Sequence, residues 1–212
     1  MGILFNPCAA REGRRLVPSA SSTPVSERIA ICHRIVRGLA ALEIGQILMM
    51  PDRDNIAIKL KSAIERDRLS TSVNMPKIHI LDRPVTYSGQ DTLKAIQLMV
   101  KAKIGAIVVL GGDGTLNEAA NGLVGTDTAL AALPGGSTNV FARTLGLPDD
   151  PVEATGALLD AIDVASIRRV GLGSVNDRHF LFHAGVGFDA AVVEQVERRG
   201  GLLKRFAGHP LY

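Results

Sequence analysis

Two glycine-rich loops near the middle of the chain carry the side chains best suited to chemistry. The first is residues 111–115, GGDGT, and the second is residues 134–139, PGGSTN; each directly follows an apolar run. Backbone N–H groups in glycine loops can approach a ligand closely and form concave sites for anions. We therefore expect a polyphosphate between the loops. Four side chains offer further donors: Thr115, Ser137, Thr138 and Asn139.

Asp113 decides what kind of phosphate chemistry the loops would support. A carboxylate among phosphate-binding groups repels the ligand unless it binds Mg²⁺ or handles a proton. Phosphoryl transfer needs both of these roles. The loops contain neither G-x-G-x-x-G nor G-x-x-x-x-G-K, so they differ from the dinucleotide-binding and P-loop patterns. Asp113 therefore indicates phosphoryl transfer with a bound Mg²⁺ rather than a plain phosphate-binding loop.

The elements around the loops alternate between strand and helix. Continuous apolar runs at residues 106–110 and 129–133 predict strands buried on both faces of a parallel sheet. Earlier strands are predicted at residues 3–5, 47–50 and 78–81, with helices between them that Asp54 and Asp91 would cap. This order predicts an α/β domain with a mostly parallel sheet. In such sheets ligands bind beyond the carboxyl ends of the strands, where both loops would lie.

The pattern changes after residue 165. Residues 169–173 and 179–184 are strand-like, and the segment VNDR between them is a hairpin signal. We expect a nucleotide-binding α/β domain at residues 1–165. Residues 166–212 would begin a second, β-rich domain.

The segments GGDGTLNEAANGL, ALPGGSTNVFAR and GVGFDAAVVE resemble the catalytic domain of the diacylglycerol kinase, sphingosine kinase and bacterial lipid kinase family. NAD kinases share its fold and its Gly-Gly-Asp-Gly loop. The resemblance implies that Asp113 is catalytic and that Glu118 and Asp189 lie on the acceptor side. In NAD kinases an Asn-Glu pair binds the NAD ribose, so Glu118 is compatible with either group. The nucleotide site implied by the resemblance comprises Asn6, Gly111, Gly112, Gly114, Thr115, Gly135, Gly136, Ser137, Thr138 and Asn139.

Two segments depart from the lipid kinase pattern. The first hundred residues, including GILFNPCAAREGRRLV, resemble ATP-NAD kinase-like proteins associated with acetoin catabolism. The Asp-Gly-Glu segment that lipid kinases carry near their end is absent from this sequence. The resemblance therefore implies that much of the acceptor-binding half is missing.

Composition narrows the choice of partners. The 212 residues carry a net charge of +3, aromatic residues make up 4% and Trp is absent, which disfavours a base-stacking platform for nucleic acid. No secretory signal or spanning apolar run is visible, so we expect a cytoplasmic protein. Peripheral contact with an anionic membrane would use a basic set interleaved with apolar residues, although a charged helix end explains that set equally well: Arg198, Arg199, Lys204 and Arg205. No metal-binding cluster of His or Cys is apparent, and the sequence leaves a homo-oligomer open.

Three functions are compatible with these observations. The leading hypothesis is an ATP- and Mg²⁺-dependent kinase of a lipid hydroxyl, most simply that of diacylglycerol. The alternatives are an NAD kinase-like enzyme and a nucleotide-binding protein that lacks catalysis because the acceptor half is incomplete.

Overall fold

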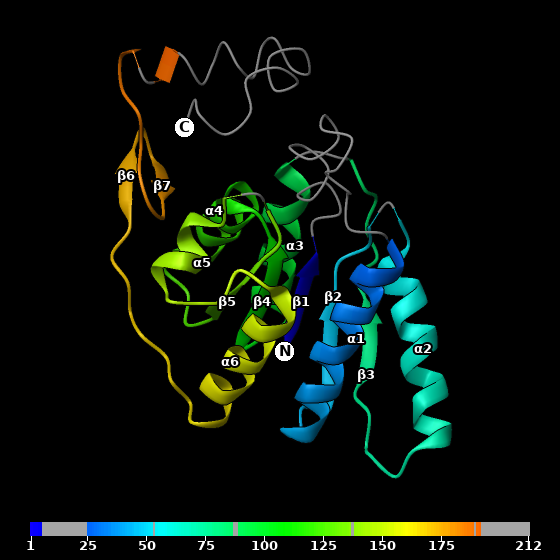
Figure 1. Cartoon of the computed structure of the whole chain (residues 1–212). Coiled ribbons are helices and arrows are strands. Elements are labelled where there is room, and N and C mark those ends of the chain that lie inside the picture. Colours follow the sequence, from blue (N-terminus) through cyan, green and yellow to red (C-terminus); the bar gives the residue numbers. More distant parts are fainter. Residues whose placement is uncertain (6–24, 53, 87–88, 137, 189, 192–212) are drawn as a thin grey trace, which may run out of the picture.

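Five short apolar strands form the centre of the molecule (Figure 1). The computed structural model describes residues 1–5, 25–52, 54–86, 89–136, 138–188 and 190–191. The elements in chain order are β1 (Gly2–Phe5), α1 (Val25–Ala41), β2 (Gln46–Met49), α2 (Ile56–Ser70), β3 (Lys77–Ile80), α3 (Gly89–Lys101), β4 (Ala106–Gly111), α4 (Asp113–Leu123), β5 (Ala129–Pro134), α5 (Val140–Thr144), α6 (Pro151–Asp163), β6 (Gly173–Val175) and β7 (Arg178–Phe180).

The five central strands are all parallel, in the order β3-β2-β1-β4-β5. β1 lies at the centre of the sheet. The chain first adds β2 and β3 on one side of β1, and then adds β4 and β5 on the other side. In open parallel sheets, ligands bind at the carboxyl edge where the order reverses in this way. The site is therefore expected at the ends of β1 and β4, at the top of Figure 1.

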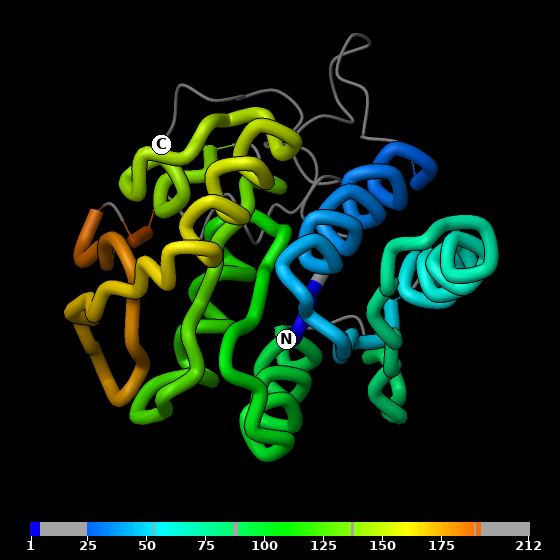
Figure 2. Tube along the Cα trace, turned by 90° about the horizontal axis from the view of Figure 1, so that it is seen from below, coloured from blue at the N-terminus to red at the C-terminus, as the bar shows by residue number. Residues whose placement is uncertain are grey.

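Alternate residues of the strands point into two separate cores. Ile3 and Val108 pack against α1, α2 and α6, whereas Leu4 and Val109 pack against α3, α4 and α5. Figure 2 shows α1 and α6 on one side of the sheet and α3 on the other. The result is a three-layer α/β fold, as predicted. Among the described helices, none has the length and apolar character needed to cross a membrane.

Helix α6 was not predicted, although the sequence carries a start signal for it. The Asp150 carboxylate accepts hydrogen bonds from the N–H groups of Val152 and Glu153, at 2.8 and 3.0 Å. Pro151 occupies the first helical position, where its fixed φ and missing N–H cost nothing. An Asp-Pro pair before a run of small and apolar residues was thus a readable N-terminus.

The predicted cap of α2 was wrong by two residues. The carboxylate of Asp52, not that of Asp54, accepts the N–H groups of Ile56 and Ala57, both at 2.9 Å. Asn55 adopts a left-handed conformation, with φ 55°, and this turn brings the first N–H groups of α2 back over Asp52. Asp52 is therefore buried at the carboxyl end of β2.

Strands β6 and β7 form a separate antiparallel hairpin. Its turn is where the sequence predicted it, because Asn176 and Asp177 both take positive φ, 48° and 60°, as a two-residue hairpin turn requires. The strands themselves are shorter than predicted, and residues 169–172 are not a strand. The domain boundary near residue 165 stays a prediction.

Cys32 gives a test of the core beneath α1. The side chain is fully buried, and burial raises the pKa of the thiol well above its usual range, with the charge of Asp52 adding to the effect. Because only the thiolate reacts, iodoacetamide at pH 8 should leave Cys32 unmodified in the folded protein and label it in guanidinium. An unfolded thiol loses its proton near pH 8.5. The folded state holds that proton more tightly, so the free energy of unfolding should fall as the pH rises above this value. Rapid native-state labelling of the Cys32 peptide, measured by mass spectrometry, would contradict the burial.

Candidate phosphate-binding site

The two glycine-rich loops lie side by side at the carboxyl edge of the sheet. Strands β4 and β5 are neighbours, and their pairing runs to the last residues, Gly111 opposite Pro134. Just beyond the strands, the N–H of Gly135 donates to the carbonyl oxygen of Gly111 at 3.1 Å. The predicted adjacency of the loops is confirmed. We call the pair, residues 111–115 and 134–139, the cradle.

The glycines allow the two backbones to touch. A Cβ on Gly135 would lie 2.8 Å from the backbone nitrogen of Gly111, and a Cβ on Gly136 would lie 2.6 Å from the Cα of Gly112. Both distances are shorter than carbon contacts allow, so a side chain at either position would push the loops apart. Gly114 differs, because a Cβ there would meet no atom within 4 Å. This exposed glycine faces open space at the start of α4.

Asp113 ties the first loop to the second. Its Oδ2 accepts the hydroxyl of Thr138 at 3.1 Å and the N–H of Val140 at 3.0 Å, and its Oδ1 accepts the N–H of Phe141 at 3.0 Å. The two N–H groups begin α5, so the carboxylate also caps that helix from the neighbouring loop. An ionised carboxylate has about four acceptor positions. Three bonds therefore leave acceptor capacity on Oδ1.

The other polar side chains of the cradle bond within it. Asn139 takes a left-handed conformation, with φ 47°, and its amide both accepts the N–H of Gly136 at 2.8 Å and donates to the Gly136 carbonyl at 3.2 Å. The Thr138 hydroxyl is directed to Asp113, and Thr115 is buried beneath Gly111. In the structure these three side chains shape the loops, and their part in binding phosphate stays a prediction.

The donors that remain for a ligand are backbone groups. The first N–H groups of an α-helix have no partners within the helix, and they lie at the positive end of its dipole. In α4 these groups belong to residues 113–115, next to the open space at Gly114. Among the described residues, the cradle therefore presents backbone N–H groups to an anion at the start of α4.

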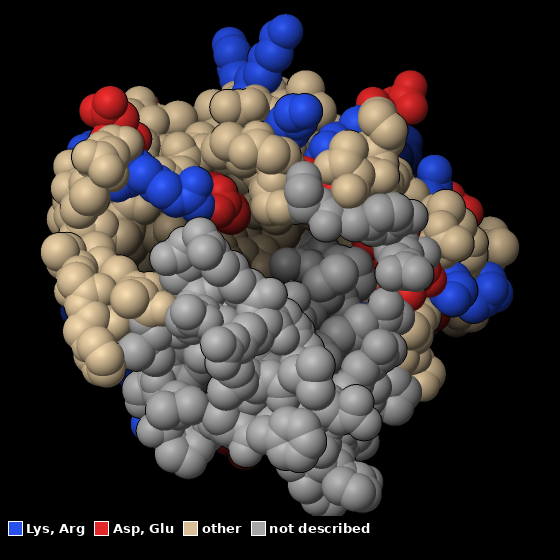
Figure 3. Space-filling model, turned by 90° about the horizontal axis from the view of Figure 1, so that it is seen from above, with Lys and Arg blue, Asp and Glu red and all other residues tan. Residues whose placement is uncertain are grey.

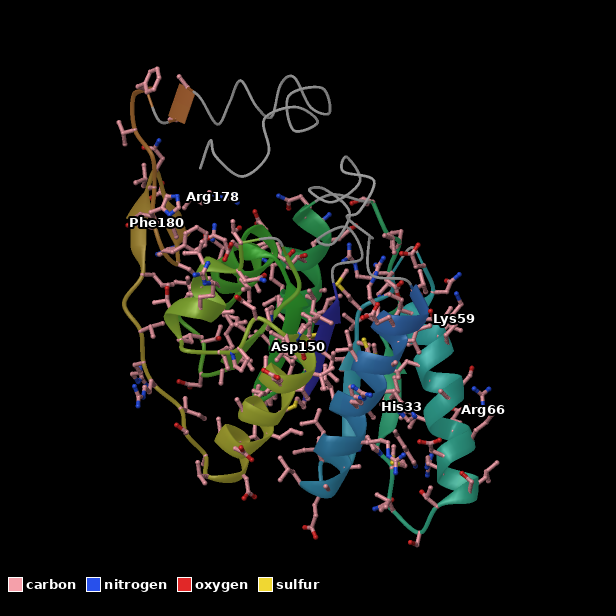
Figure 4. The ribbon with its side chains drawn as sticks, viewed as in Figure 1. His33, Lys59, Arg66, Asp150, Arg178 and Phe180 are labelled. Atoms are coloured by element: carbon pink, nitrogen blue, oxygen red, sulfur yellow. The ribbon has the colours of Figure 1, made fainter. Side chains whose placement is uncertain are left out.

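Glu118 lies where three elements meet. Its carboxylate forms an ion pair with Arg178 of β7 (Figure 4) and lies beside Gly89 at the start of α3, where an added Cβ would be 3.6 Å from its Cδ. The Glu118 side chain is 19% exposed and Arg178 is 59% exposed, so the pair is at the surface. Three predicted site residues, Asn6, Ser137 and Asp189, lie outside the described residues, as does the basic set at residues 198–205.

Sequence reasoning missed a cluster that holds the loop after β3. Arg83 donates to the Oδ1 of Asp91 at 2.7 Å, and the hydroxyl and N–H of Thr86 both donate to the same carboxylate at 2.8 Å. Asp91 was predicted to cap α3. The helix instead begins at Gly89, and Asp91 in its first turn holds the preceding loop. The sequence signal was an acid shortly after a predicted strand, with an Arg between them.

Figure 3 looks down on this edge of the sheet, where basic and acidic side chains of the described part border a hollow. Within the described ranges, no three His, Cys, Asp or Glu side chains gather into a metal site of their own. Mg²⁺ is usually held by one or two carboxylates together with substrate phosphates. Asp113, with acceptor capacity left on Oδ1 inside the cradle, fits that mode of binding.

Both glycine-rich loops lie within a segment that matches a known protein family. Residues 75–175 match the diacylglycerol kinase catalytic domain. The chain is also similar to "Acetoin catabolism protein X" of Cupriavidus necator, at 39% identity over 54% of this chain and 32% of that protein. It is 36% identical to "Probable lipid kinase YegS-like" of Chromohalobacter salexigens over 63% of this chain and 42% of that protein.

The fold leads to the same family. A diacylglycerol kinase structure from Bacillus anthracis superposes with a TM-score of 0.51 and 27% identity, covering 85% of this chain and 45% of that chain. The chain thus resembles diacylglycerol kinases in both sequence and fold. It spans less than half the length of each of these three proteins.

Proposed function

We propose that the protein is an ATP- and Mg²⁺-dependent phosphotransferase of the diacylglycerol kinase type that acts on a lipid hydroxyl. The observation that carries the proposal is the cradle, in which two neighbouring loops are joined by the carboxylate of Asp113. The match of residues 75–175 to the diacylglycerol kinase catalytic domain supports it. Diacylglycerol is the first acceptor to test.

The chain's contribution to transfer would be positioning and charge. Backbone N–H groups at the start of α4 would bind phosphate oxygens, since they are fixed in place before the ligand arrives. Asp113 would keep the second loop against the first and offer its free Oδ1 position to Mg²⁺. The metal, when bound, would offset negative charge on the transferring phosphoryl group.

The acceptor side of the site is a further part of the proposal. Asp189 and Glu118 are proposed to face the lipid hydroxyl. The residues proposed to form the nucleotide site are Asn6, Gly111, Gly112, Gly114, Thr115, Gly135, Gly136, Ser137, Thr138 and Asn139. Glu118 is engaged with Arg178 in the structure, so it would act while held in that pair. A lipid acceptor would bring the protein to a membrane surface, where the basic set could contact anionic headgroups.

Binding and turnover should be tested separately, because the chain spans less than half of its relatives. ATP with Mg²⁺ at about 100 times its Kd should add about 2.7 kcal/mol of stability. This corresponds to a rise in melting temperature of roughly 2–4 °C per kcal/mol for a domain of this size.

Phosphatidic acid formation from diacylglycerol micelles would then establish the lipid kinase activity. NADP formation from NAD would favour the NAD kinase-like alternative, and binding without any product would favour a nucleotide-binding protein. No stabilisation by ATP would refute the proposal.

Gly114→Ala should separate ligand binding from folding. The new Cβ meets no protein atom within 4 Å, so the fold should be retained, with about 0.5–1 kcal/mol gained from helix propensity. The same methyl group would occupy the space through which phosphate approaches the first N–H groups of α4. We expect the Kd for ATP with Mg²⁺, measured by calorimetry, to rise about tenfold, which corresponds to roughly 1.4 kcal/mol. Gly156→Ala in α6, also exposed and free of contacts, is the matched control and should leave the Kd unchanged.

A further inference from the structure

Helix α4 holds the hairpin through two asparagines spaced one helical turn apart. The N–H of His179 donates to the Oδ1 of Asn121 at 2.9 Å, and the Nδ2 of Asn121 donates back to the His179 carbonyl at 2.9 Å. The N–H of Leu181 donates to the Oδ1 of Asn117 at 3.2 Å. Both asparagines thus bond to the backbone of the same extended segment.

This arrangement replaces a neighbouring strand. Asn121 satisfies both backbone groups of His179, which is the pattern that a paired strand residue would provide. The opposite edge of β7 pairs with β6, in the register Ser174 opposite His179. Both edges of β7 are therefore occupied, one by a strand and the other by side chains of a helix.

A third contact starts between the two asparagines along α4. Glu118 follows Asn117 on α4 and pairs with Arg178, the first residue of β7. The contacts of α4 side chains with Arg178, His179 and Leu181 fix both the direction and the register of β7 along the helix. In Figure 1 the hairpin runs alongside α4, and the chain after β7 continues upward beyond the carboxyl edge of the sheet.

The same helix begins in the cradle. Asp113 is the first residue of α4, and Asn117 follows it by four residues, or about one turn, some 6 Å along the axis. A helix of this length is stiff, so its first turn and its asparagines move together. The start of the segment beyond β7, at Leu181, is thereby placed relative to the N–H groups at the start of α4.

We propose that Asn117 and Asn121 are positioning residues that set the acceptor-side segment, residues 181–188, against the cradle, so that nucleotide binding and seating of the hairpin are coupled. This inference rests on the proposed function, since it requires that the cradle binds ATP with Mg²⁺. Coupling of two sites is reciprocal: if the nucleotide tightens the hairpin, loss of the hairpin contacts must weaken nucleotide binding by the same factor.

The test uses the full chain and measures amide exchange by NMR, with and without ATP and Mg²⁺. In the wild-type protein, the nucleotide should slow exchange at the N–H groups of His179 and Leu181 about fivefold. The double variant Asn117→Ala/Asn121→Ala should exchange rapidly at both positions, should no longer respond to the nucleotide, and should bind ATP with Mg²⁺ about fivefold more weakly. Alanine favours helix more than asparagine does, so α4 itself is not weakened.

The controls separate the inference from the proposed function. Asn74→Ala, an exposed asparagine away from the hairpin, should leave exchange and affinity unchanged. The single variant Asn117→Ala removes only the bond to Leu181 and keeps the test available if the double variant does not fold. Wild-type protein that does not bind ATP would refute the proposed function and this inference with it. The inference alone would be refuted if ATP bound without slowing amide exchange at His179 and Leu181. It would also be refuted if a variant with faster exchange at these positions kept the wild-type affinity for ATP. The asparagines would then have only a structural role.

Discussion

Gly136→Ala should open the cradle and abolish tight nucleotide binding. The new Cβ would lie 2.6 Å from the Cα of Gly112 and 3.2 Å from the Oδ1 of Asn139. The first obstacle is backbone, which cannot rotate away as a side chain would, so the loops must separate. We expect the free energy of unfolding to fall by about 2–3 kcal/mol, the upper part of the range of about 1–3 kcal/mol that overpacking usually costs. The Kd for ATP with Mg²⁺ should rise well over tenfold, because the N–H groups of the two loops would no longer converge.

Denaturant unfolding and calorimetry would measure the two effects of Gly136→Ala. Gly156→Ala serves again as the control, since an added methyl group in α6 meets nothing and should stabilise the helix slightly. A Gly136→Ala protein with unaltered stability would show that the loops do not touch as described. If stability fell while ATP affinity held, the cradle would not be the nucleotide site.

Asp113→Asn should weaken the protein and its nucleotide binding together. The amide keeps one acceptor oxygen, but its NH₂ group would face a backbone N–H of Val140 or Phe141, so one donor loses its partner and meets another donor. Leaving a buried donor unpaired costs about 1–3 kcal/mol, and more where the lost partner was charged. We therefore expect the free energy of unfolding to fall by about 2–3 kcal/mol.

The affinity of Asp113→Asn for ATP in the absence of Mg²⁺ distinguishes two roles of Asp113, because the two roles predict changes of opposite sign. If the cradle stayed intact, removal of a negative charge beside the triphosphate would strengthen metal-free ATP binding. The bonds to α5 predict the opposite, because the second loop would no longer be held in place. Asp127→Asn, at an exposed acid between α4 and β5, is the matched control and should change neither quantity. Stronger metal-free binding by Asp113→Asn at full stability would mean that the carboxylate acts only on metal or proton and does not support the loops.

Thr138→Val tests the hydrogen bond between Thr138 and Asp113 from its other end. Valine keeps the shape of threonine but removes the hydroxyl that donates to Asp113. Combined with Asp113→Asn in a double-mutant cycle, the two changes should be non-additive, since they act on one bonded group.

The sheet could be predicted from sequence because β4 and β5 are continuous apolar runs that end at glycine-rich loops. Parallel strands buried on both faces have this composition, and their carboxyl ends lie at one edge. The adjacency of the loops followed from the order of the elements alone. Helix α6 was missed because its buried residues are few and partly small, so its apolar pattern is weak.

The bonding inside the site could not be predicted in the same way. Asp113 meets the N–H groups of Val140 and Phe141 across 27 and 28 residues of chain, and only the register of β4 with β5 brings them together. The partners of Asn117 and Asn121 are more distant still, at 64 and 58 residues. A polar residue that follows a glycine-rich loop offers hydrogen-bond donors and acceptors. The sequence does not show whether these groups bond to a ligand or to other parts of the protein.

Both halves of the cradle come from one continuous stretch, β4–α4–β5–α5, and this has a consequence for folding kinetics. Contacts between nearby parts of a chain close small loops, and they cost less chain entropy than contacts between distant parts. The link from Asp113 to α5 should therefore form early in refolding, with high φ-values, while attachment of the hairpin to Asn121 should come late and show low ones. On this view the anion site would be ready before the acceptor side has been assembled around it.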